Sequence, residues 1–366
     1  MPEDQPKLRI AQIFSHTMIN GVGTSLEVLL RQLNARGHEI MLVHRPDSWL
    51  VNQTSDLPLT RLESRLKTRY KELYRVGDSI RNWKADVIHT HGSTAHKYGA
   101  IYRVAGKIPI VATAHACHFQ LHWIFNNRVI APSQITADYH HRVNRVSRRN
   151  LRIVHHAFDI ANAPLATKED RVQRREELGL PNDAFVLGMT GSICERKNQM
   201  ACVDVLEKLR QNDVDAHLVL IGEPGQWEYT KGLREHVKQQ GLEPYVHLLG
   251  VRLDAPALLA ALDAYLCTSL HEEGPIATLE AMSAGLPVIT TRIGCMPALM
   301  ADDKGGKMFA PEDIDGMVAF AAELAGDPDL RRRLGTEGHH QVVSQLSPEA
   351  VVPQVEAVYR EVAKNR

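Results

Sequence analysis

The string Glu272-Glu-Gly-Pro-Ile-Ala-Thr-Leu-Glu280 continues as Ala281-Met-Ser-Ala-Gly-Leu-Pro-Val-Ile289. It follows a short apolar run, Ala264–Thr268, and ends in a second one, Leu286–Thr291, and both are typical of strands. Between them Gly274-Pro275 predicts the start of a helix. A strand, a helix and a second strand within about thirty residues predict a right-handed βαβ unit in a buried parallel sheet.

The same alternation of apolar runs and amphipathic stretches extends over almost the whole chain. Further strands are predicted at residues 8–14, 40–44, 86–90, 108–114, 128–132, 152–156, 185–190, 216–221, 246–250 and 306–310. Helices are predicted at residues 24–36, 60–82 and 95–105, and throughout the chain beyond residue 312. A polar, charge-rich linker near residues 160–180 separates two such units, so we predict an α/β fold of two Rossmann-like domains.

Composition agrees with a globular chain of this kind. A length of 366 residues suits two domains, and 23% charged residues is ordinary for a soluble protein. No apolar run approaches the roughly 18 residues that span a bilayer, and the polar first residues do not form a signal peptide. The five cysteines are odd in number and form no C-x-x-C pair, which favours free thiols in the cytoplasm.

The net charge of zero is unevenly distributed. Residues 1–160 hold 22 basic and 12 acidic residues, a net charge of +10, and the remainder carries −10. Two basic stretches, 61–81 and 140–152, account for much of the excess, and the second contains five arginines and no acid. An anionic acceptor or membrane surface is therefore expected for the N-terminal half, with a solvated basic face as the alternative. No reading motif supports nucleic acid as the partner.

The two glutamates of the opening string suggest a nucleotide site. Ligands bind beyond the carboxyl ends of strands in open α/β sheets, and this string lies there. The predicted helix start at Gly274, Pro275 and Ile276 offers N–H groups and a dipole to a phosphate. Glu280, further along the helix, is expected to accept hydrogen bonds from a ribose diol, and Glu272 to meet a sugar. Two solvated carboxylates on a capped helix are the alternative.

Metal binding is not expected. His115, Cys117, His118 and His122 lie close in sequence, but their spacing is not that of a standard zinc site. Asp213-Val-Asp215 resembles a D-x-D metal motif, but it precedes a strand and is interpreted as a loop remote from a carboxyl-end site.

The opening string also resembles the signature of the retaining glycosyltransferases of family four, which have the GT-B fold. Their pattern is Glu, seven residues, and Glu-Ala-Met/Leu-Ala-x-Gly-x-Pro-Val-Ile. The resemblance extends over nearly the whole chain, through Gly21-Val-Gly23 with Arg36-Gly-His38, Asp86-Val-Ile-His-Thr-His91, Pro109–His115, Leu220-Ile-Gly222 and Leu248-Leu-Gly250. Bacterial lipopolysaccharide and polysaccharide glycosyltransferases belong to this group.

This resemblance implies the domain plan and the reaction. An acceptor-binding domain, residues 1–162, would be joined by the C-terminal helix 349–366, and residues 163–348 would bind the nucleotide sugar, with the two parallel sheets facing an interdomain cleft. The implied reaction moves a hexose, with a uridine nucleotide as the favoured carrier, to a hydroxyl of a glycan or glycolipid acceptor in cell-surface polysaccharide biosynthesis. It retains the anomeric configuration, needs no metal or other cofactor, and takes place in the cytoplasm, at the inner membrane face if the basic surface binds lipid.

The resemblance also implies roles for residues outside the opening string. Arg196 and Lys197 would stabilise the leaving diphosphate, because fixed cations in a dry cleft stabilise developing negative charge strongly. Gly21 and Gly23 would let the backbone approach the donor, and His115 would orient a sugar or the acceptor. Ser192 occupies a position where many members carry Arg, and Arg196 would restore that charge, as in some lipopolysaccharide-core glucosyltransferases.

Three departures and three alternatives stay open at this point. Glu273 and Ala298 stand where the family usually has Gly and Glu, and His156-Ala157 replaces an Asn-Gly turn. The alternatives are a nucleotide-sugar epimerase of the same fold, a nicotinamide-dependent dehydrogenase, and a non-catalytic sugar-nucleotide-binding protein. The incomplete glycine fingerprint at Gly21 and the strong motif in the second half argue against the dehydrogenase.

Overall fold

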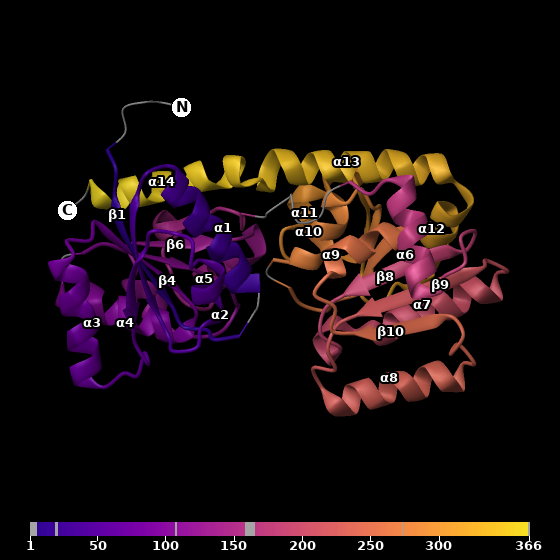
Figure 1. Cartoon of the computed structure of the whole chain (residues 1–366), viewed down its shortest axis with the longest axis horizontal. Helices are drawn as coiled ribbons and strands as arrows, with labels where there is room; N and C mark the ends of the chain where they lie inside the picture. Colours follow the sequence, from indigo (N-terminus) through magenta and orange to yellow (C-terminus); the bar gives the residue numbers. More distant parts are fainter. Residues whose placement is uncertain (1–5, 19–20, 107, 158–164, 273, 365–366) are drawn as a thin grey trace. The chain divides into compact units, whose positions relative to one another are not determined.

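The computed structural model describes residues 6–18, 21–106, 108–157, 165–272 and 274–364. The chain divides into two compact units (Figure 1): Met1–Phe158 with Leu346–Arg366 form unit 1, and Asp159–Gln345 form unit 2. The predicted boundary between residues 162 and 163 lies outside the described residues. Each unit is a parallel α/β sheet with helices, which confirms the predicted fold class.

Unit 1 is built on a seven-stranded parallel sheet in the order β3-β2-β1-β4-β5-β6-β7. Its strands are β1 (Arg9–Phe14), β2 (Glu39–His44), β3 (Thr60–Glu63), β4 (Val87–His91), β5 (Ile110–Thr113), β6 (Arg128–Ala131) and β7 (Leu151–Ile153). Its α-helices are α1 (Gly21–Ala35), α2 (Trp49–Gln53), α3 (Tyr70–Asn82), α4 (Ser93–Ala105), α5 (Gln134–Arg142) and α14 (Pro348–Ala363).

Alternation along the strands gives this sheet two different faces. In β1, Ile10 and Phe14 pack with α1 and α14, whereas Ala11 and Ile13 pack with α3 and α4. Strands buried on both faces read as continuous apolar runs, which is why the sequence predicts them well. Gln12 shares the α14 face with Ile10 and Phe14 and is fully buried there, so a polar group stands within an apolar layer.

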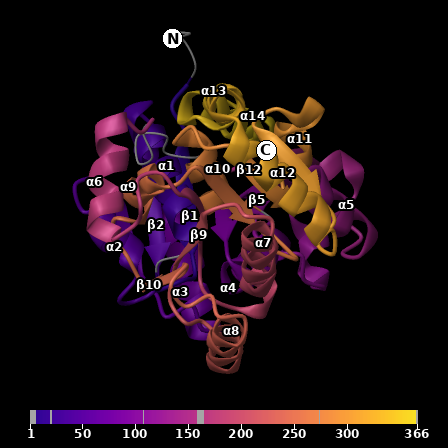
Figure 2. The same ribbon diagram turned by 90° about the vertical axis from the view of Figure 1, so that its right-hand side faces the viewer.

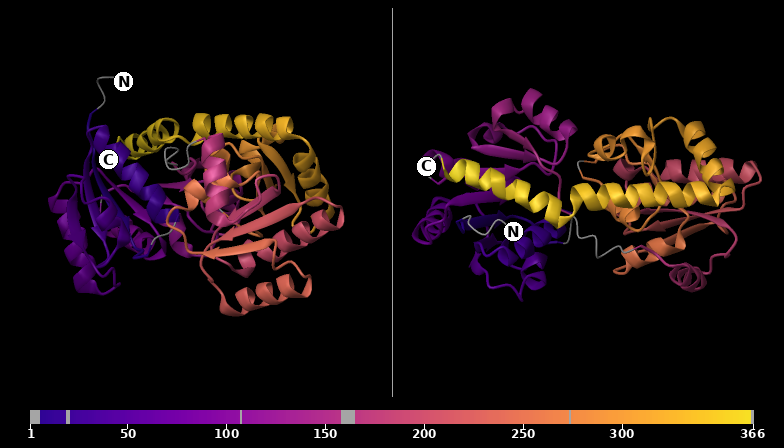
Figure 3. Two further views of the ribbon diagram at one scale, coloured as in Figure 1. Left: turned by 45° about the vertical axis from the view of Figure 1, so that its right-hand side comes forward. Right: turned by 90° about the horizontal axis from the view of Figure 1, so that it is seen from above.

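Helix α14 is part of unit 1 although it ends the chain. Its valines 351, 352, 355, 358 and 362 join the core formed by α1 and the central strands. Figure 3 shows the yellow α14 beside the indigo α1. Glu356 bonds His38 at 2.6 Å, and Glu361 pairs with Arg128 at 2.6 Å. These contacts bring the last helix into the N-terminal core.

Unit 2 contains a six-stranded parallel sheet in the order β10-β9-β8-β11-β12-β13. The strands are β8 (Phe185–Thr190), β9 (Ala216–Ile221), β10 (Val246–Gly250), β11 (Ala264–Cys267), β12 (Val288–Thr291) and β13 (Gly306–Phe309). The α-helices are α6 (Lys168–Leu178), α7 (Gln199–Gln211), α8 (Trp227–Gln239), α9 (Ala255–Leu258), α10 (Ile276–Ser283), α11 (Met296–Leu299), α12 (Ile314–Gly326) and α13 (Pro328–Leu346). Helices α7 and α12 lie side by side (Figure 2).

Three local predictions were wrong. The predicted helix 60–82 is divided into β3 and α3, because β3 adds to the sheet edge beside β2. The charge-rich stretch predicted as a linker contains α6, which a Thr167–Asp170 capping box starts and Gly179, at a φ of 65°, ends. Gly21 and Gly23 belong to the first turn of α1 instead of a preceding loop. Gly23 lies there against Phe14 and Trp49, where a Cβ would make ordinary contacts.

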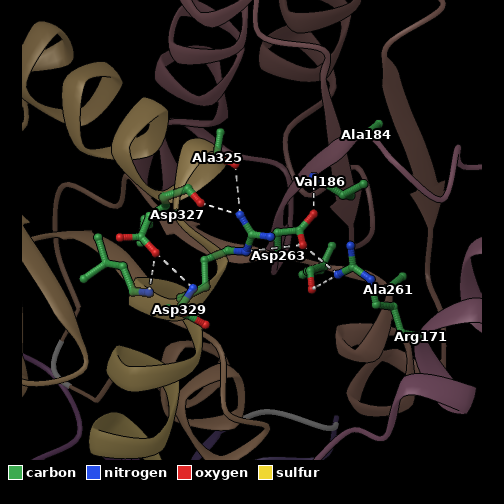
Figure 4. A network of polar contacts seen from close by, with 12 residues as sticks. Arg171, Ala184, Val186, Ala261, Asp263, Ala325, Asp327 and Asp329 are labelled. Carbon is green, nitrogen blue, oxygen red and sulfur yellow. Dashed lines mark hydrogen bonds and ion pairs between the residues drawn. The ribbon is translucent and has the colours of Figure 1, made fainter.

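One buried carboxylate ties several elements of unit 2 together (Figure 4). Asp263, just before β11, accepts a hydrogen bond from the amide of Val186 at 2.8 Å and from Arg171 at 2.6 Å. Arg175 on α6, whose side chain is fully buried, bonds Asp263 at 2.6 Å and four backbone carbonyls. Arg331 of α13 lies 3.8 Å away. The carboxylate therefore links α6 and β8 to β11 and also attracts α13.

We expect Asp263→Ala to destabilise unit 2 by about 3–5 kcal/mol, because it leaves the buried Arg175 guanidinium without its counter-charge. Urea unfolding measures this loss for the whole chain, and hydrogen exchange of the backbone amides measures it at β8 and β11. Asp329→Ala is the control: Asp329 pairs with Arg332 at 2.9 Å, but both side chains are at least 74% exposed, and the change should stay within about 0.5 kcal/mol. Equal losses in the two variants would contradict the argument.

Candidate functional site

In unit 2 the predicted cations and the first motif glutamate converge. Strands β8 and β11 are neighbours in the parallel sheet, so the loops that follow them lie at the same edge. Arg196 and Lys197 come from the turn after β8, and Glu272 from the loop after β11. The Glu272 Oε1 atom lies 2.7 Å from Arg196 Nη1 and 2.5 Å from Lys197 Nζ. Residues far apart in sequence therefore form one ion cluster.

Backbone contacts fix the two loops against each other. The amide of Leu270 donates to the Arg196 carbonyl at 2.8 Å, and Arg196 Nη1 donates to the His271 carbonyl at 3.0 Å. The Thr268 hydroxyl donates to the Asn198 carbonyl at 2.8 Å. Gly191, at a φ of 144°, lets Lys197 cross it closely, because a Cβ there would stand 3.0 Å from Lys197 Cε. The cluster is therefore held by its backbone as well as by charge.

The side chains of the ion cluster differ in exposure, and one carboxylate oxygen of Glu272 can accept a further hydrogen bond. The side chains of Lys197 and Glu272 are only 13% and 10% exposed, whereas Arg196 is 50% exposed. Both cations contact Oε1, and no described residue bonds Oε2 of Glu272. Two cations and one carboxylate leave a net charge of +1, which suits an incoming anion. The sequence prediction gave the cations and Glu272 separate tasks and did not foresee that they pair.

Glu280, the second motif glutamate, has no such pairing. It lies on α10, and no hydrogen bond or ion pair from the described residues reaches its carboxylate. Burial raises the pKa of Glu280 to about 7, and the charge of Lys197 only partly opposes that rise. Glu280 is only partly exposed, and a partly desolvated carboxylate is stabilised by a ligand that supplies a hydrogen-bond donor. Glu280 is thus an unsatisfied acceptor beside a cationic cluster.

The remaining predicted residues of unit 2 surround this pair of glutamates. Pro275 precedes α10, which begins at Ile276. The amide of Ile276 donates to the Gly274 carbonyl and that of Thr278 to the Pro275 carbonyl, both at 2.9 Å, so these two N–H groups are engaged within the turn. Ser192 donates to Glu223 at 3.3 Å. Glu273 lies outside the described residues.

In unit 1 the predicted His115 belongs to a cluster of imidazoles. His115 follows β5, and its Nε2 lies 3.1 Å from His91 Nδ1. The ring of His156 stacks on it with centroids 4.9 Å apart and an angle of 7°. Burial lowers the pKa of His91 and His115 well below the ordinary range and that of His156 to about 4. These rings are therefore neutral at pH 7. Gly21 and Gly23 lie in the same unit, in α1.

The residues weighed as metal ligands are His115, Cys117, His118, His122, Asp213 and Asp215. Among the described residues no three His, Cys, Asp or Glu side chains converge in a way that could hold an ion. Asp213 lies in the turn before β9 with a φ of 57°, and Asp215 pairs with Arg210, as expected for a surface loop.

Two family models match the chain. Residues 19–162 match the model described as Glycosyltransferase Family 4, and residues 170–341 match Glycosyl transferases group 1, so the two together cover most of the sequence. The chain is a family-4-like glycosyltransferase. The resemblance inferred from the motifs is thereby confirmed, as is the transferase class of enzyme.

Individual relatives of this glycosyltransferase agree with the family assignment. N-acetyl-alpha-D-glucosaminyl L-malate synthase of Bacillus anthracis is 24% identical, with 98% of each chain covered. The Escherichia coli UDP-Gal:alpha-D-GlcNAc-diphosphoundecaprenol alpha-1,3-galactosyltransferase is 26% identical over 71% of each chain. The solved structure of Anabaena HepE in complex with UDP has a TM-score of 0.86 at 20% identity and covers 97% of this chain and all of that one. This likeness shows the shared GT-B fold.

Sequence reasoning missed several buried polar residues next to His115. Gln12, His89, Thr113 and Tyr359 form hydrogen bonds within the same layer of unit 1. The available signal was Gln12, a polar residue at the centre of an apolar strand, since such residues are rare without a specific partner.

The pKa of Glu280 has a consequence for stability. Burial raises the pKa of Glu280 from 4.5 to about 7. At pH values between these two, the Glu280 carboxyl is therefore protonated in the folded protein and ionised in the unfolded chain. The free energy of unfolding of the wild type should therefore fall, relative to that of Glu280→Gln, as the pH rises from about 4.5 to about 7. Above pH 7 this relative loss should stay constant, at up to ~3 kcal/mol.

Urea unfolding of both proteins at pH 4, 6 and 8 measures this difference. Glu243→Gln is the control, because it makes the same substitution at an exposed glutamate of unit 2. A constant difference between wild type and Glu280→Gln at all three pH values would disprove the proton linkage.

Proposed function

We propose that this glycosyltransferase moves a hexose from a UDP-hexose to a hydroxyl group of a glycan or lipid-linked acceptor, with retention of configuration and without a bound metal. The observation that carries the proposal is the convergence of Arg196, Lys197 and Glu272 beside the unpaired Glu280 carboxylate. A nucleoside diphosphate carries an anionic diphosphate, which matches the two cations, and a ribose diol, which matches the Glu280 carboxylate.

The donor is held through complementary groups of unit 2. The Glu280 carboxylate accepts from the ribose diol, which supplies the donors that the protein does not. The diphosphate binds Arg196 and Lys197, and Oε2 of Glu272 remains to accept from a sugar hydroxyl. Ser192 and the Gly274-Pro275-Ile276 turn line the same edge of the sheet. A uridine carrier is favoured because the galactosyltransferase relative is named for UDP-Gal and the Anabaena structure contains UDP.

The proposed reaction needs leaving-group stabilisation. The bond between the anomeric carbon and the diphosphate oxygen breaks, and a bond from the acceptor oxygen to that carbon forms on the same face. The acceptor's proton passes to the leaving phosphate oxygen. Negative charge on the diphosphate grows along this path, so Arg196 and Lys197 act most strongly in the transition state. Two cations in place of a metal ion make the reaction independent of divalent metals.

In unit 1, His115 is proposed to orient a hydroxyl group of the sugar or acceptor. Its neutral imidazole offers one donor and one acceptor. Gly21 and Gly23 are proposed to give the first turn of α1 close access to the donor. The Escherichia coli relative is named for a diphosphoundecaprenol-linked acceptor, and by analogy the acceptor proposed here is a lipid-linked glycan. We propose that this glycan belongs to a bacterial surface polysaccharide such as lipopolysaccharide, extended at the cytoplasmic side of the membrane.

Product analysis tests this function directly. We expect UDP-hexose with a lipid-diphosphate glycan acceptor to yield UDP and a product with the donor's anomeric configuration, at an unchanged rate in EDTA. A donor-only incubation is the control. Conversion of the sugar without acceptor would indicate an epimerase, and binding without turnover a non-catalytic protein. Loss of activity in EDTA with rescue by Mg²⁺ or Mn²⁺ would contradict the metal-free mechanism.

Lys197→Ala should lower kcat about 10²-fold and change the donor KM much less, because the removed charge acts mainly on the leaving diphosphate. Steady-state kinetics with the matched variant Lys208→Ala, which removes an exposed lysine paired with Asp315, controls for net charge. A rise in KM at constant kcat would show that Lys197 binds substrate and transition state equally and would refute the role assigned to it.

We also propose that unit 1 binds an anionic membrane. Its basic-apolar surface is an open hollow of about 670 Å³ whose lining includes Arg103, Val104, Ile124, Phe125 and Arg149. Val104 is 74% exposed, and Ile124 and Phe125 are more than 40% exposed. A surface that combines exposed apolar side chains with arginines suits the boundary between acyl chains and anionic headgroups. Among the described residues no helix is long and apolar enough to span a bilayer.

Replacing Arg103 and Arg149 by Gln should weaken binding to anionic vesicles about 30-fold at low salt, since each basic residue contributes about 1 kcal/mol. Co-sedimentation with phosphatidylglycerol-containing and purely zwitterionic vesicles measures this effect. The control removes two exposed arginines of unit 2, Arg332 and Arg333, and should bind like the wild type. Equal, negligible binding of the wild type to both vesicle types would leave a soluble acceptor as the better interpretation.

A further inference from the structure

Unit 1 contains a continuous set of polar side chains inside its apolar layer. We call it the Gln12 network; its members are Gln12, His89, His91, Thr113, His115 and Tyr359. All except His115 are at most 5% exposed. The strand residues share the α14 face of β1, β4 and β5, because they alternate with residues that face α3 and α4. Tyr359 enters from α14.

Five hydrogen bonds join these groups in a line. Thr113 Oγ1 lies 2.7 Å from His89 Nε2, and His89 Nδ1 lies 2.7 Å from the Tyr359 hydroxyl. Gln12 Nε2 donates to that hydroxyl at 3.1 Å, and Gln12 Oε1 lies 2.9 Å from His91 Nε2. The last bond connects His91 Nδ1 with His115 Nε2 at 3.1 Å.

The amide of Gln12 gives this line a direction. Its Oε1 can only accept, so His91 Nε2 carries the proton. Burial lowers the pKa of His91 and keeps its ring neutral, so its Nδ1 is a bare acceptor. That atom must accept from His115 Nε2–H, which leaves the lone pair of the neutral His115 on Nδ1. On the other side, the Tyr359 hydroxyl accepts from Gln12 and donates to His89.

We propose that Gln12 and Tyr359 are positioning residues that hold His115 in the Nε2–H tautomer, so that its Nδ1 accepts a hydrogen bond from a hydroxyl group of the sugar or acceptor. With the Gln12 amide in the observed orientation, all five bonds are consistent with this one tautomer, whereas turning the amide over would reverse every donor and acceptor in the line. No described residue bonds His115 Nδ1. The assignment of a sugar hydroxyl to this atom rests on the proposed function.

The other members act only through His115. The cavity beside His89, His91 and His156 holds about 30 Å³, enough for a water molecule and far too little for a sugar ring. His115 is the member of the network with appreciable exposure, and the stacked ring of His156 holds its plane. A change at Gln12 can therefore reach a substrate only by changing the protonation pattern or position of His115.

Imidazole ¹⁵N shifts test the proposal on the full, substrate-free chain. In the wild type at pH 7 we expect His115 Nε2 to be protonated and Nδ1 to be bare. Gln12→Met keeps the side-chain length but removes both polar atoms, so His115 should become a mixture of tautomers. Tyr359→Phe removes one oxygen and lets the amide turn over, so it should give a smaller shift if Gln12→Met fails to fold. In both variants, kcat/KM should fall in proportion to the fraction of His115 that remains in the Nε2–H tautomer, because only that fraction can accept the substrate hydrogen bond at Nδ1.

Thr90→Val is the matched control. Thr90 lies on β4 between His89 and His91, but its hydroxyl faces the other side and bonds His96 at 2.8 Å. This variant should lose stability while the His115 tautomer and kcat/KM stay as in the wild type. A bare Nε2 on His115 in the wild type, or a His115 tautomer unchanged in Gln12→Met, would overturn the proposal. So would a changed tautomer with unchanged kcat/KM. Failure of the proposed function itself would appear separately, as absence of transfer by the wild type.

Discussion

A buried negative charge in unit 2 must be neutralised, and much of that unit is arranged to do so. Asp263 achieves this with Arg175, Arg171 and the amide of Val186. Because these partners come from α6 and β8, the start of β11 has little freedom to move. At the other end of this strand, Thr268 follows directly and Glu272 lies in the loop after it. The position of the ion cluster at the carboxyl edge therefore depends on a network at the amino edge, which no substrate needs to touch.

Much of the fold could be predicted because buried parallel strands appear in the sequence as short continuous apolar runs, whereas the flanking helices have apolar residues on one face only. Strands such as Phe185–Thr190 and Ala216–Ile221 have the bounds that their apolar runs indicate. The strand at Thr60–Glu63 was missed because it is only partly buried at a sheet edge and lacks a long apolar run. Helix α6 was missed because charged residues fill it, and its stability depends on a capping box and on Arg175, whose buried partner Asp263 is 88 residues away.

The candidate site could be predicted in its residue types but not in its pairings. The sequence placed Glu272 after one predicted strand, Glu280 in the helix that follows, and Arg196 and Lys197 after another strand, and the structure brings Glu272 to both cations. Which carboxylate is paired and which is bare depends on side-chain positions within a few ångströms, and a linear pattern does not specify these. The Gln12 network is harder still, because Tyr359 and Gln12 are separated by 347 residues. A glutamine within an apolar strand shows that a partner exists and does not say where it is.

The place of α14 in unit 1 has a consequence for the order in which the protein is made. A ribosome delivers residues 159–345 in full before it reaches Val351 and Tyr359, which complete the core and the polar line of unit 1. Unit 2 can therefore close while unit 1, although begun first, still lacks one helix of its core. During synthesis the N-terminal sheet would expose an apolar face for the length of nearly two hundred further codons, a period in which chaperones have a surface to bind.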